Sequence, residues 1–248
     1  MGPLFLVVEG MDGAGKSTQI ERLAGWLTEA GSPPVVTREP GATAIGERIR
    51  EILLDPASAA MDPKTEALLY AADRAQHAAE VIRPALAAGR VVISDRYVDS
   101  SLAYQGLARG LGIERILDLS MWATGDLLPD LVILLDVAPE LARARSGATD
   151  RIELEDEAFH RRVADAYWAL ARTYPERFLA VDASAPPDAI EAEIRRHVEA
   201  RLAAAGESPL GGVPSERPEE VRKENRVTHG QVCEALPAAG FPTGQAPR

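Results

Sequence analysis

Cysteine is almost absent from this sequence of 248 residues, in which Cys233 is the only one. A single cysteine excludes an internal disulfide framework and any metal site built from several thiolates. The four histidines are scattered along the chain, at His77, His160, His197 and His229, and show no metal-ligand spacing. We therefore expect a protein of the reducing cytoplasm, without a metal centre made of cysteine and histidine.

Long apolar runs are missing as well. No stretch approaches the ~20 residues that a membrane-spanning helix needs, and no basic region precedes the first apolar stretch, as it would in a signal peptide. An excess of positive charge is also lacking, since 27 Lys and Arg stand against 38 Asp and Glu, for a net charge of −11. This balance argues against nucleic acid or an anionic membrane as a partner. It still allows a small anionic substrate, because a few clustered arginines suffice to bind one.

Five short apolar runs predict strands. Their continuous apolar character is typical of strands buried on both faces of a parallel sheet. The runs are Leu4–Glu9, Val35–Arg38, Val91–Asp95, Leu131–Asp136 and Phe178–Asp182, and helices are predicted near residues 16–30, 43–54, 63–88, 113–124, 156–173 and 187–204. Pro84 should kink or split the third helix near its end.

Alternating strands and helices predict an α/β fold with a doubly wound, five-stranded parallel sheet. Ligands of such sheets bind beyond the carboxyl ends of the strands. We therefore expect the chemistry just after Glu9, Arg38, Asp95 and Asp136.

The composition changes at about residue 205. Residues 205–248 are rich in glycine, proline and charge, without a sustained apolar period. We therefore predict one domain over residues 1–204 and a disordered tail over residues 205–248. Within that tail, Glu219–Leu236 has room for one short helix but cannot form a core of its own.

The clearest motif is the GxxxxGKS pattern of a P-loop, which follows the first predicted strand and opens a predicted helix. Glycines let backbone N–H groups turn toward phosphate oxygens, the lysine supplies a charge to the β- and γ-phosphates, and the hydroxyl can bind Mg²⁺. A glycine-rich turn that matches by chance would not need all of these parts at once. We expect ATP to be bound by Gly10, Met11, Asp12, Gly13, Ala14, Gly15, Lys16, Ser17 and Thr18.

A P-loop alone leaves open a kinase, a GTPase, a motor or a nucleotide sensor. The NKxD segment that selects guanine is absent from the sequence. The third strand ends instead in Asp95, placed to hold Mg²⁺ together with Ser17, and in Arg96, placed to bridge a donor and an acceptor phosphate. The alternatives are a turn or cap residue for Asp95 and a surface salt bridge for Arg96. The strand tip nevertheless favours phosphoryl transfer.

Several blocks of the sequence resemble the thymidylate kinase family of P-loop nucleoside-monophosphate kinases. The longest block covers residues 93–105, and shorter ones cover 37–41, 71–76, 129–137 and 150–153 in family order. The resemblance extends over roughly residues 4–202. It implies transfer of the γ-phosphoryl group of ATP to dTMP, giving dTDP for dTTP synthesis, with Mg²⁺ as the cofactor. It also implies a homodimer.

The resemblance assigns the acceptor site residue by residue. Tyr70 would stack on thymine, where the family usually has phenylalanine, and Arg74 would bind the base edge. The alternatives are helix core for Tyr70 and an exposed salt bridge for Arg74. Asp12 would contact the sugar 3′-hydroxyl or water around the metal. The other residues implied in substrate binding are Arg38, Glu39, Pro40, Arg50, Arg96, Ser100, Ser101, Tyr104 and Gln105.

A flexible segment over about residues 143–152 resembles the lid that closes over ATP. The P-loop carries no arginine, which in this family implies that the lid supplies the transition-state arginines. Arg145 and Arg151 are the expected catalytic residues, followed by Arg143, in addition to Lys16 and Arg96. A merely solvated basic loop is the alternative.

Two other functions stay open at this point. A deoxynucleoside kinase would share the cradle but would need a carboxylate base near the acceptor hydroxyl, for which Glu9 is the candidate close by. A regulatory module that binds nucleotide without turnover would need only the P-loop.

Overall fold

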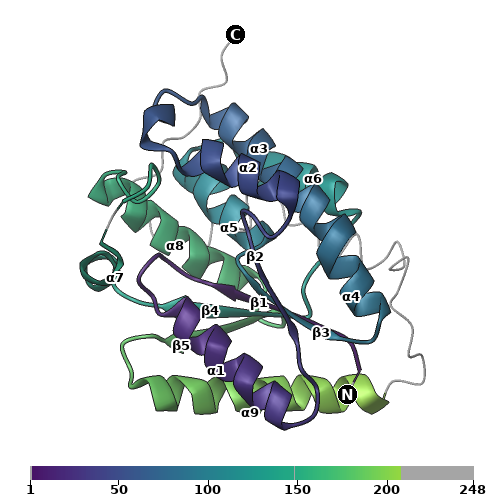
Figure 1. Cartoon of the computed structure of the whole chain (residues 1–248). Helices are drawn as coiled ribbons and strands as arrows, with labels where there is room; N and C mark the ends of the chain where they lie inside the picture. The colour runs from purple at the N-terminus through teal and green to yellow at the C-terminus, as the bar shows by residue number, and fades with distance from the viewer. Residues whose placement is uncertain (1, 148, 208–248) are drawn as a thin grey trace.

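The structure is a computed structural model that describes residues 2–147 and 149–207. Its five strands form one parallel sheet in the order β2-β3-β1-β4-β5 (Figure 1). The strands are β1 (Leu4–Glu9), β2 (Val35–Arg38), β3 (Val91–Asp95), β4 (Leu131–Asp136) and β5 (Phe178–Asp182). The predicted sheet is confirmed, with the predicted bounds. The predicted disorder of residues 208–248, and the short helix considered within them, lie outside the described residues.

The register of the sheet brings the carboxyl ends of its strands together. Val8 of β1 pairs with Asp95 of β3, and Asp95 pairs in turn with Arg38 of β2. On the other side of β1, Val8 pairs with Ile133 of β4. The loops after β1, β2, β3 and β4 therefore start at one edge, which is where ligands bind in an open α/β sheet.

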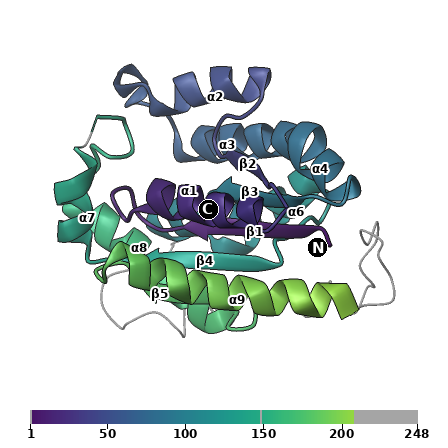
Figure 2. The ribbon, with the colours of Figure 1, turned by 60° about the horizontal axis from the view of Figure 1, so that its bottom comes forward.

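Helices cover both faces of the sheet (Figure 2). Because side chains alternate along a strand, Leu4, Leu6 and Val8 of β1 pack toward one face, with α1 (Lys16–Glu29) and α9 (Pro187–Glu207). Phe5 and Val7 pack toward the other face, with α3 (Pro63–His77), α4 (Arg83–Ala87), α6 (Ile113–Thr124) and α8 (Glu157–Thr173). Helix α9 ends three residues beyond the predicted bound of 204.

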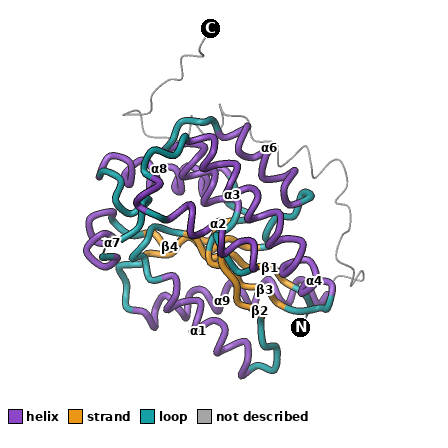
Figure 3. The backbone as a smooth tube through the Cα atoms, turned by 45° about the horizontal axis from the view of Figure 1, so that its top comes forward, coloured by secondary structure: helices purple, strands orange, loops and turns teal. Residues whose placement is uncertain are grey.

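The helices depart from the prediction in three places. The predicted helix 63–88 contains a π-helical segment, η2 (Ala78–Ile82), between α3 and α4. Its wider turn precedes Pro84, whose ring would otherwise clash with the carbonyl four residues earlier. The segment after β3 forms α5 (Val98–Ser101) and a second π-helix, η3 (Leu102–Ala108). A short helix, α7 (Pro139–Ser146), lies at the edge of the molecule and ends within the predicted lid (Figure 3).

The remaining elements lie between β2 and α3. Helix α2 (Ala44–Leu54) begins after Thr43, whose side chain accepts a hydrogen bond from the Gly46 amide, a typical N-cap. A 3₁₀ turn, η1 (Pro56–Ser58), follows it. Within residues 2–147 and 149–207, no helix has the length and apolarity that crossing a bilayer requires.

Candidate active site

The P-loop connects β1 to α1 through three glycines with positive φ. Gly10, Gly13 and Gly15 have φ values of 139°, 84° and 93°, which side-chain-bearing residues rarely adopt. Gly15 caps α1 in the left-handed conformation, and no side chain caps the N–H groups of the first turn. The N-terminus of α1 thus keeps its donors available to an anion.

Lys16 lies buried inside this loop. Its Nζ donates to the carbonyl oxygens of Gly10 at 3.2 Å and Met11 at 3.0 Å, and pairs with Asp12 Oδ1 at 3.3 Å. Burial and the nearby Arg96 guanidinium lower the pKa of Lys16. The cation therefore sits at the centre of the loop, as a phosphate-binding lysine must.

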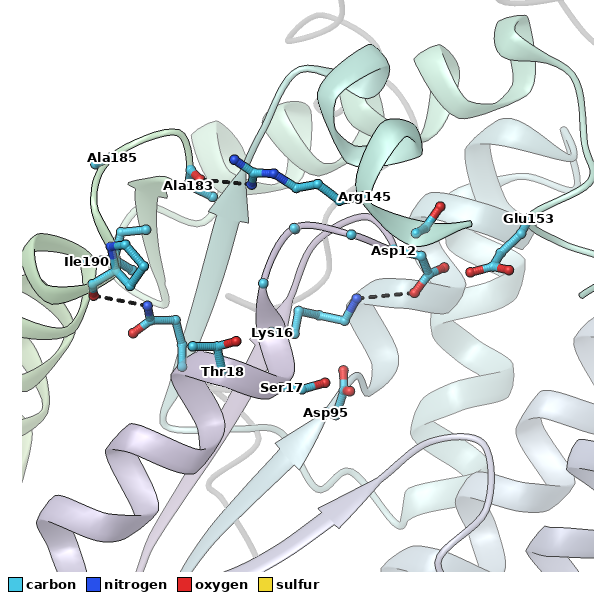
Figure 4. Close-up of a pocket in the computed structure, with 16 residues that line it drawn as sticks. Asp12, Lys16, Ser17, Thr18, Asp95, Arg145, Glu153, Ala183, Ala185 and Ile190 are labelled. Atoms are coloured by element: carbon cyan, nitrogen blue, oxygen red, sulfur yellow. Dashed lines mark hydrogen bonds and ion pairs between the residues drawn. The ribbon is translucent and has the colours of Figure 1, made fainter. Parts of the chain in front are cut away.

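A cavity opens directly above the P-loop (Figure 4). Besides residues 12–19, it is lined by Asp95, by Arg145 and Ser146 of the predicted lid, and by Glu153. Its far wall is formed by the loop after β5, with Ala183 and Ala185, and by the start of α9, with Pro187 and Ile190. This wall was not predicted from the sequence, although the carboxyl end of the fifth strand was a signal for it.

The end of β3 offers ligands for a hard cation. Asp95 Oδ1 is buried and has no hydrogen-bond partner among the described residues. The Ser17 hydroxyl lies close by on the same cavity wall (Figure 4). Within the described part of the chain, no group of three or more His, Cys, Asp or Glu could hold a metal without help. Asp95 and Ser17 fit Mg²⁺ that takes its remaining ligands from phosphates and water.

A second cavity lies on the other side of Asp12, Ser17 and Asp95, which line both. Most residues expected to bind the acceptor line it, namely Asp12, Arg38, Glu39, Pro40, Arg50, Tyr70, Arg96, Ser100, Tyr104 and Gln105. Leu54, Asp150 and Ile152 line it too and were not expected. The two cavities therefore share a wall made of the P-loop and the tip of β3.

Arg96 projects into the second cavity from a strained backbone. Its φ is 69°, in the left-handed region, which is costly for a residue with a Cβ and is found at functional sites. The Arg96 N–H donates to the Val8 carbonyl at 3.0 Å, and its own carbonyl accepts from the Ser94 hydroxyl at 2.8 Å. These two bonds hold the conformation that turns the side chain out of the line of β3.

The Arg96 guanidinium is paired with Asp12 of the P-loop. Nη2 lies 2.5 Å from Asp12 Oδ1, and the guanidinium carbon lies 5.5 Å from the centre of the Tyr104 ring. Burial alone would raise the pKa of Asp12, but Arg96 and Lys16 together hold that pKa well below its usual range. Burial alone would likewise lower the pKa of Arg96, yet Asp12 raises it further above its usual value. The site thus places one carboxylate between two cations.

Glu9 lies behind this pair, fully buried, and lines neither cavity. Oε1 accepts from the amides of Tyr97 at 2.9 Å and Ser100 at 3.1 Å. Oε2 accepts from the hydroxyls of Ser100 at 2.6 Å and Tyr167 at 2.8 Å. Burial raises the pKa of Glu9 to about 7. With these four hydrogen bonds, the Glu9 carboxylate stabilises the start of α5 and does not face a cavity in which an acceptor could bind.

Arg74, expected to bind a base edge, lies away from the second cavity. It is fully buried and does not line that cavity. Its guanidinium donates to Glu39 Oε2 at 2.8 Å, to the hydroxyls of Ser101 and Ser120 at 2.9 and 3.1 Å, and to the Tyr97 carbonyl at 3.2 Å. Ser101, also expected at the substrate, faces this network and not the cavity. Neither Arg74 nor Ser101 lines this cavity in the structure, and their roles in substrate binding stay predictions.

The lid arginines divide into three different situations. Arg145 lines the cavity above the P-loop, and its Nη1 donates to the Ala183 carbonyl at 3.4 Å (Figure 4). Arg143 is exposed and lines neither cavity. Arg151 is buried, with Nη1 2.7 Å from Glu66 Oε2 and Nε donating to the Leu53 carbonyl at 2.9 Å. In this structure Glu66 of α3 holds Arg151, which lines neither cavity, and its catalytic role stays a prediction.

A second buried polar cluster lies beneath Glu39. His77 contacts Glu39 Oε1 through Nδ1 at 2.9 Å and the Thr37 hydroxyl through Nε2 at 2.6 Å. Asp73 Oδ1 accepts from the Gly41 amide at 2.9 Å, whereas its Oδ2 is buried without a partner among the described residues. Burial and the neighbouring Glu39 carboxylate raise the pKa of Asp73 to about 7. This cluster fixes the loop that follows β2.

Comparisons with known proteins point to one family. A family model described as thymidylate kinase matches residues 8–194. A thymidylate kinase of Clavibacter sepedonicus is 51% identical over 208 residues, which cover 82% of this chain and 98% of that protein. One of Leifsonia xyli subsp. xyli is 53% identical, with 80% and 96% covered. A crystal structure of thymidylate kinase from Ehrlichia chaffeensis matches with a TM-score of 0.66 at 30% identity, and covers 80% of this chain and 99% of that one.

Proposed function

The chain belongs to the thymidylate kinase family, and we propose that it transfers the γ-phosphoryl group of ATP to dTMP, giving dTDP for dTTP synthesis. One observation carries the proposal: two cavities share a wall formed by Asp12, Ser17 and Asp95. One cavity contains the P-loop and the other contains Tyr70 and Arg96. A donor and an acceptor phosphate placed in them would meet at this wall, where proximity alone lowers the barrier substantially.

Charge neutralisation would supply most of the remaining catalysis. Lys16 would bind the β- and γ-phosphates, Arg145 would approach them from the lid, and Arg96 would hold the acceptor phosphate. A phosphomonoester has a second pKa of about 6, so the acceptor is already anionic near neutral pH. The reaction therefore needs no general base.

Mg²⁺ would be held by Ser17 and Asp95 together with the nucleotide. The orphaned Oδ1 of Asp95 supports this assignment, since a buried carboxylate oxygen without a hydrogen bond is otherwise unfavourable. When bound, the cation would neutralise phosphate charge between the β- and γ-positions.

Each wall of the acceptor cavity would contact a different part of dTMP. Tyr70 would stack on the base, and Gln105, whose Nε2 donates to Glu66 Oε1 at 2.8 Å, would offer its amide oxygen to it. Tyr104 would crowd the sugar 2′ position and so favour deoxyribose. Asp12 would contact the 3′-hydroxyl, and Arg38 and Arg50 would surround the phosphate. Arg50 also donates to the Pro40 carbonyl at 2.9 Å, which keeps it beside this cavity.

The adenine base of ATP would lie on the loop between β5 and α9. Ala183, Ala185, Pro187 and Ile190 give this wall an apolar surface suited to a base. Gln19 Nε2 donates to the Pro187 carbonyl at 3.1 Å and so ties the start of α9 to α1. Closure of Arg145 over the Ala183 carbonyl would then cover the nucleotide and exclude water.

The rival deoxynucleoside kinase is disfavoured by the environment of Glu9. Its two carboxylate oxygens accept four hydrogen bonds from the protein, and neither oxygen borders the acceptor cavity. A base for a neutral 5′-hydroxyl would have to reach that hydroxyl directly or through one water. A nucleotide-binding module without turnover, in turn, would have no use for an acceptor cavity beside the P-loop.

A substrate panel tests these functions against each other. The protein is mixed with ATP and Mg²⁺ and with dTMP, dUMP, thymidine, dCMP or no acceptor, and ADP release is measured. Preference for dTMP by at least about 10-fold in kcat/KM supports the proposal. Preference for thymidine would support the deoxynucleoside kinase, and binding of ATP without ADP release would support the module.

We also propose a cytoplasmic homodimer that packs through α3 and α6. These helices pack side by side, and each exposes a large apolar side chain, Leu68 at 58% and Trp122 at 83%. Burial of such side chains would favour association. Trp122→Glu is expected to convert a dimer into a monomer, as measured by light scattering, with Trp168→Glu on α8 as the control. A monomeric wild type would contradict the proposal.

A further inference from the structure

The Tyr167 hydroxyl lies at the centre of a buried cluster to which the phosphoryl-transfer scheme assigns no role. The ring of Tyr167, on α8, is 2% exposed and packs in the core. Its hydroxyl lies 2.8 Å from Glu9 Oε2, 2.9 Å from the Ser100 hydroxyl and 3.3 Å from Arg96 Nη1. Tyr167 lines neither cavity, so it does not act by touching either substrate.

The hydrogen bonds give this hydroxyl a defined orientation. A phenol has one proton, and here it is donated to the Glu9 carboxylate. The oxygen lone pairs are then available to accept the N–H of Arg96 Nη1. Burial and the Glu9 carboxylate raise the pKa of Tyr167, so the phenol keeps its proton throughout the working range of pH. The chain from Glu9 through Tyr167 to Arg96 therefore has one consistent direction.

Arg96 depends on a small number of such contacts. Nη2 pairs with Asp12, while Nη1 donates to the hydroxyls of Ser100 at 3.2 Å and Tyr167 at 3.3 Å. Both hydroxyls also donate to Glu9 Oε2. Hydrogen bonds from both Nη1 and Nη2 restrict rotation about the terminal torsion angles of the Arg96 side chain. The direction that it presents to the acceptor cavity is thereby fixed.

We propose that Tyr167 is a positioning residue for the phosphoryl transfer: its hydroxyl, oriented by Glu9, fixes the guanidinium of Arg96 in the place where the acceptor phosphate binds. The inference rests on the proposed function, because it needs Arg96 to bind phosphate. It adds a residue that touches no substrate and acts only through another side chain. Its effect should therefore appear in the chemical step more than in ground-state binding.

Tyr167→Phe tests the proposal, because it removes one oxygen atom and keeps the buried ring. We expect kcat to fall roughly 10-fold, as for one lost hydrogen bond to a charged group, with KM for ATP unchanged. The matched control is Tyr97→Phe. Tyr97 is also fully buried, but its hydroxyl donates to the Leu127 carbonyl at 3.2 Å, away from Arg96. We expect kcat of the control to stay within about 2-fold of wild type.

A double-mutant cycle separates positioning from a structural effect. If Tyr167 acts only through Arg96, then Tyr167→Phe in an Arg96→Ala background changes kcat by less than about 2-fold. An equal 10-fold loss in both backgrounds would overturn the proposal, as would equal losses for Tyr167→Phe and Tyr97→Phe. Circular dichroism and Tm verify that each variant folds.

The same cycle shows which of the two proposals fails. If Arg96→Ala retains wild-type kcat, then Arg96 does not serve the reaction, and both the assignment of Arg96 and the inference are wrong. If Arg96→Ala is strongly impaired but Tyr167→Phe equals wild type, only the role of Tyr167 is wrong. The substrate panel with the wild-type protein tests the overall activity independently of both.

Discussion

The donor side and the acceptor side of the site are built in different ways. The donor side is dominated by contiguous residues, 12–19, whose backbone shape is set by glycines and by the start of α1. The acceptor side gathers side chains from the loop after β2, from α2, α3, the tip of β3, η3 and the end of the lid. A local sequence motif therefore forms the donor side, whereas packing between distant segments forms the acceptor side.

The main cation of each side is also held by different kinds of partner. On the donor side, Lys16 is surrounded by backbone carbonyls of its own loop. On the acceptor side, Arg96 is held by Asp12, Ser100 and Tyr167, each of which has its own partner. Substitutions on the donor side should therefore act directly, while those on the acceptor side should act through chains of contacts as well.

The largest effect should come from the donor side. Lys16→Ala removes the charge that we propose binds the β- and γ-phosphates, so we expect a loss of roughly 10³-fold in kcat/KM with the fold retained. Steady-state kinetics and Tm measure the two quantities. Lys64→Ala, at an exposed position on α3, is the control. An unchanged kcat for Lys16→Ala would contradict a role of the P-loop in the reaction, and only the acceptor side would then remain assigned to it.

Arg96→Ala is the corresponding change on the acceptor side. We expect a loss of about 2–4 kcal/mol in transition-state stabilisation, measured as the ratio of kcat/KM values for dTMP. KM for ATP should stay close to wild type, because Arg96 does not line the donor cavity. A variant in which only ATP affinity falls would show that Arg96 belongs to the donor side.

Arg151→Met tests how the lid joins the two sides. Arg151 docks the end of the lid on Glu66, which also accepts from Gln105 of the acceptor cavity. Loosening this contact should admit water, so we expect ADP release without dTMP to rise on the order of 5-fold relative to dTDP formation. Arg109→Met removes another partner of Glu66 from outside the lid and serves as the control. Equal ratios for both variants would contradict a role of Arg151 in closure.

The last expected effect is on stability and concerns the cluster beneath the acceptor side. Asp73 has a pKa of about 7 in the folded protein, above the value near 3.9 of an unfolded chain. Its ionisation therefore lowers stability progressively as pH rises from about 4 to about 7. Asp73→Asn should be more stable relative to wild type at pH 8 than at pH 5, by roughly 2–3 kcal/mol. Urea unfolding at the two pH values, with exposed Asp118→Asn as the control, measures the difference; a constant difference would refute it.

The same contrast explains how much could be predicted from the sequence. The strands were predicted with their observed bounds, because strands buried on both faces are continuous apolar runs. The P-loop was readable because its parts are adjacent in the chain. The resemblance to a family predicted the residues of the acceptor side. Most of these residues line one cavity in the structure.

What the sequence could not supply is the orientation of side chains. Arg145 and Arg151 are both arginines of one segment, and only their distant partners, Ala183 and Glu66, show that one faces the nucleotide cavity and the other does not. Glu9 and Tyr167 lie 158 positions apart, so no local pattern connects them. The π-helix over Leu102–Ala108 escaped prediction as well, because residue propensities do not distinguish it from an α-helix.

Gly13 has a consequence for how the lid can close. A Cβ atom at this position would overlap the Ala142 carbonyl oxygen of α7, so the lid helix rests directly on the bare backbone of the P-loop. Any side chain at residue 13 would act as a wedge that props α7 away and withdraws Arg145 with it. The size of residue 13 therefore limits how closely α7 can approach the P-loop. A single methyl group there is expected to hold α7 away from the loop.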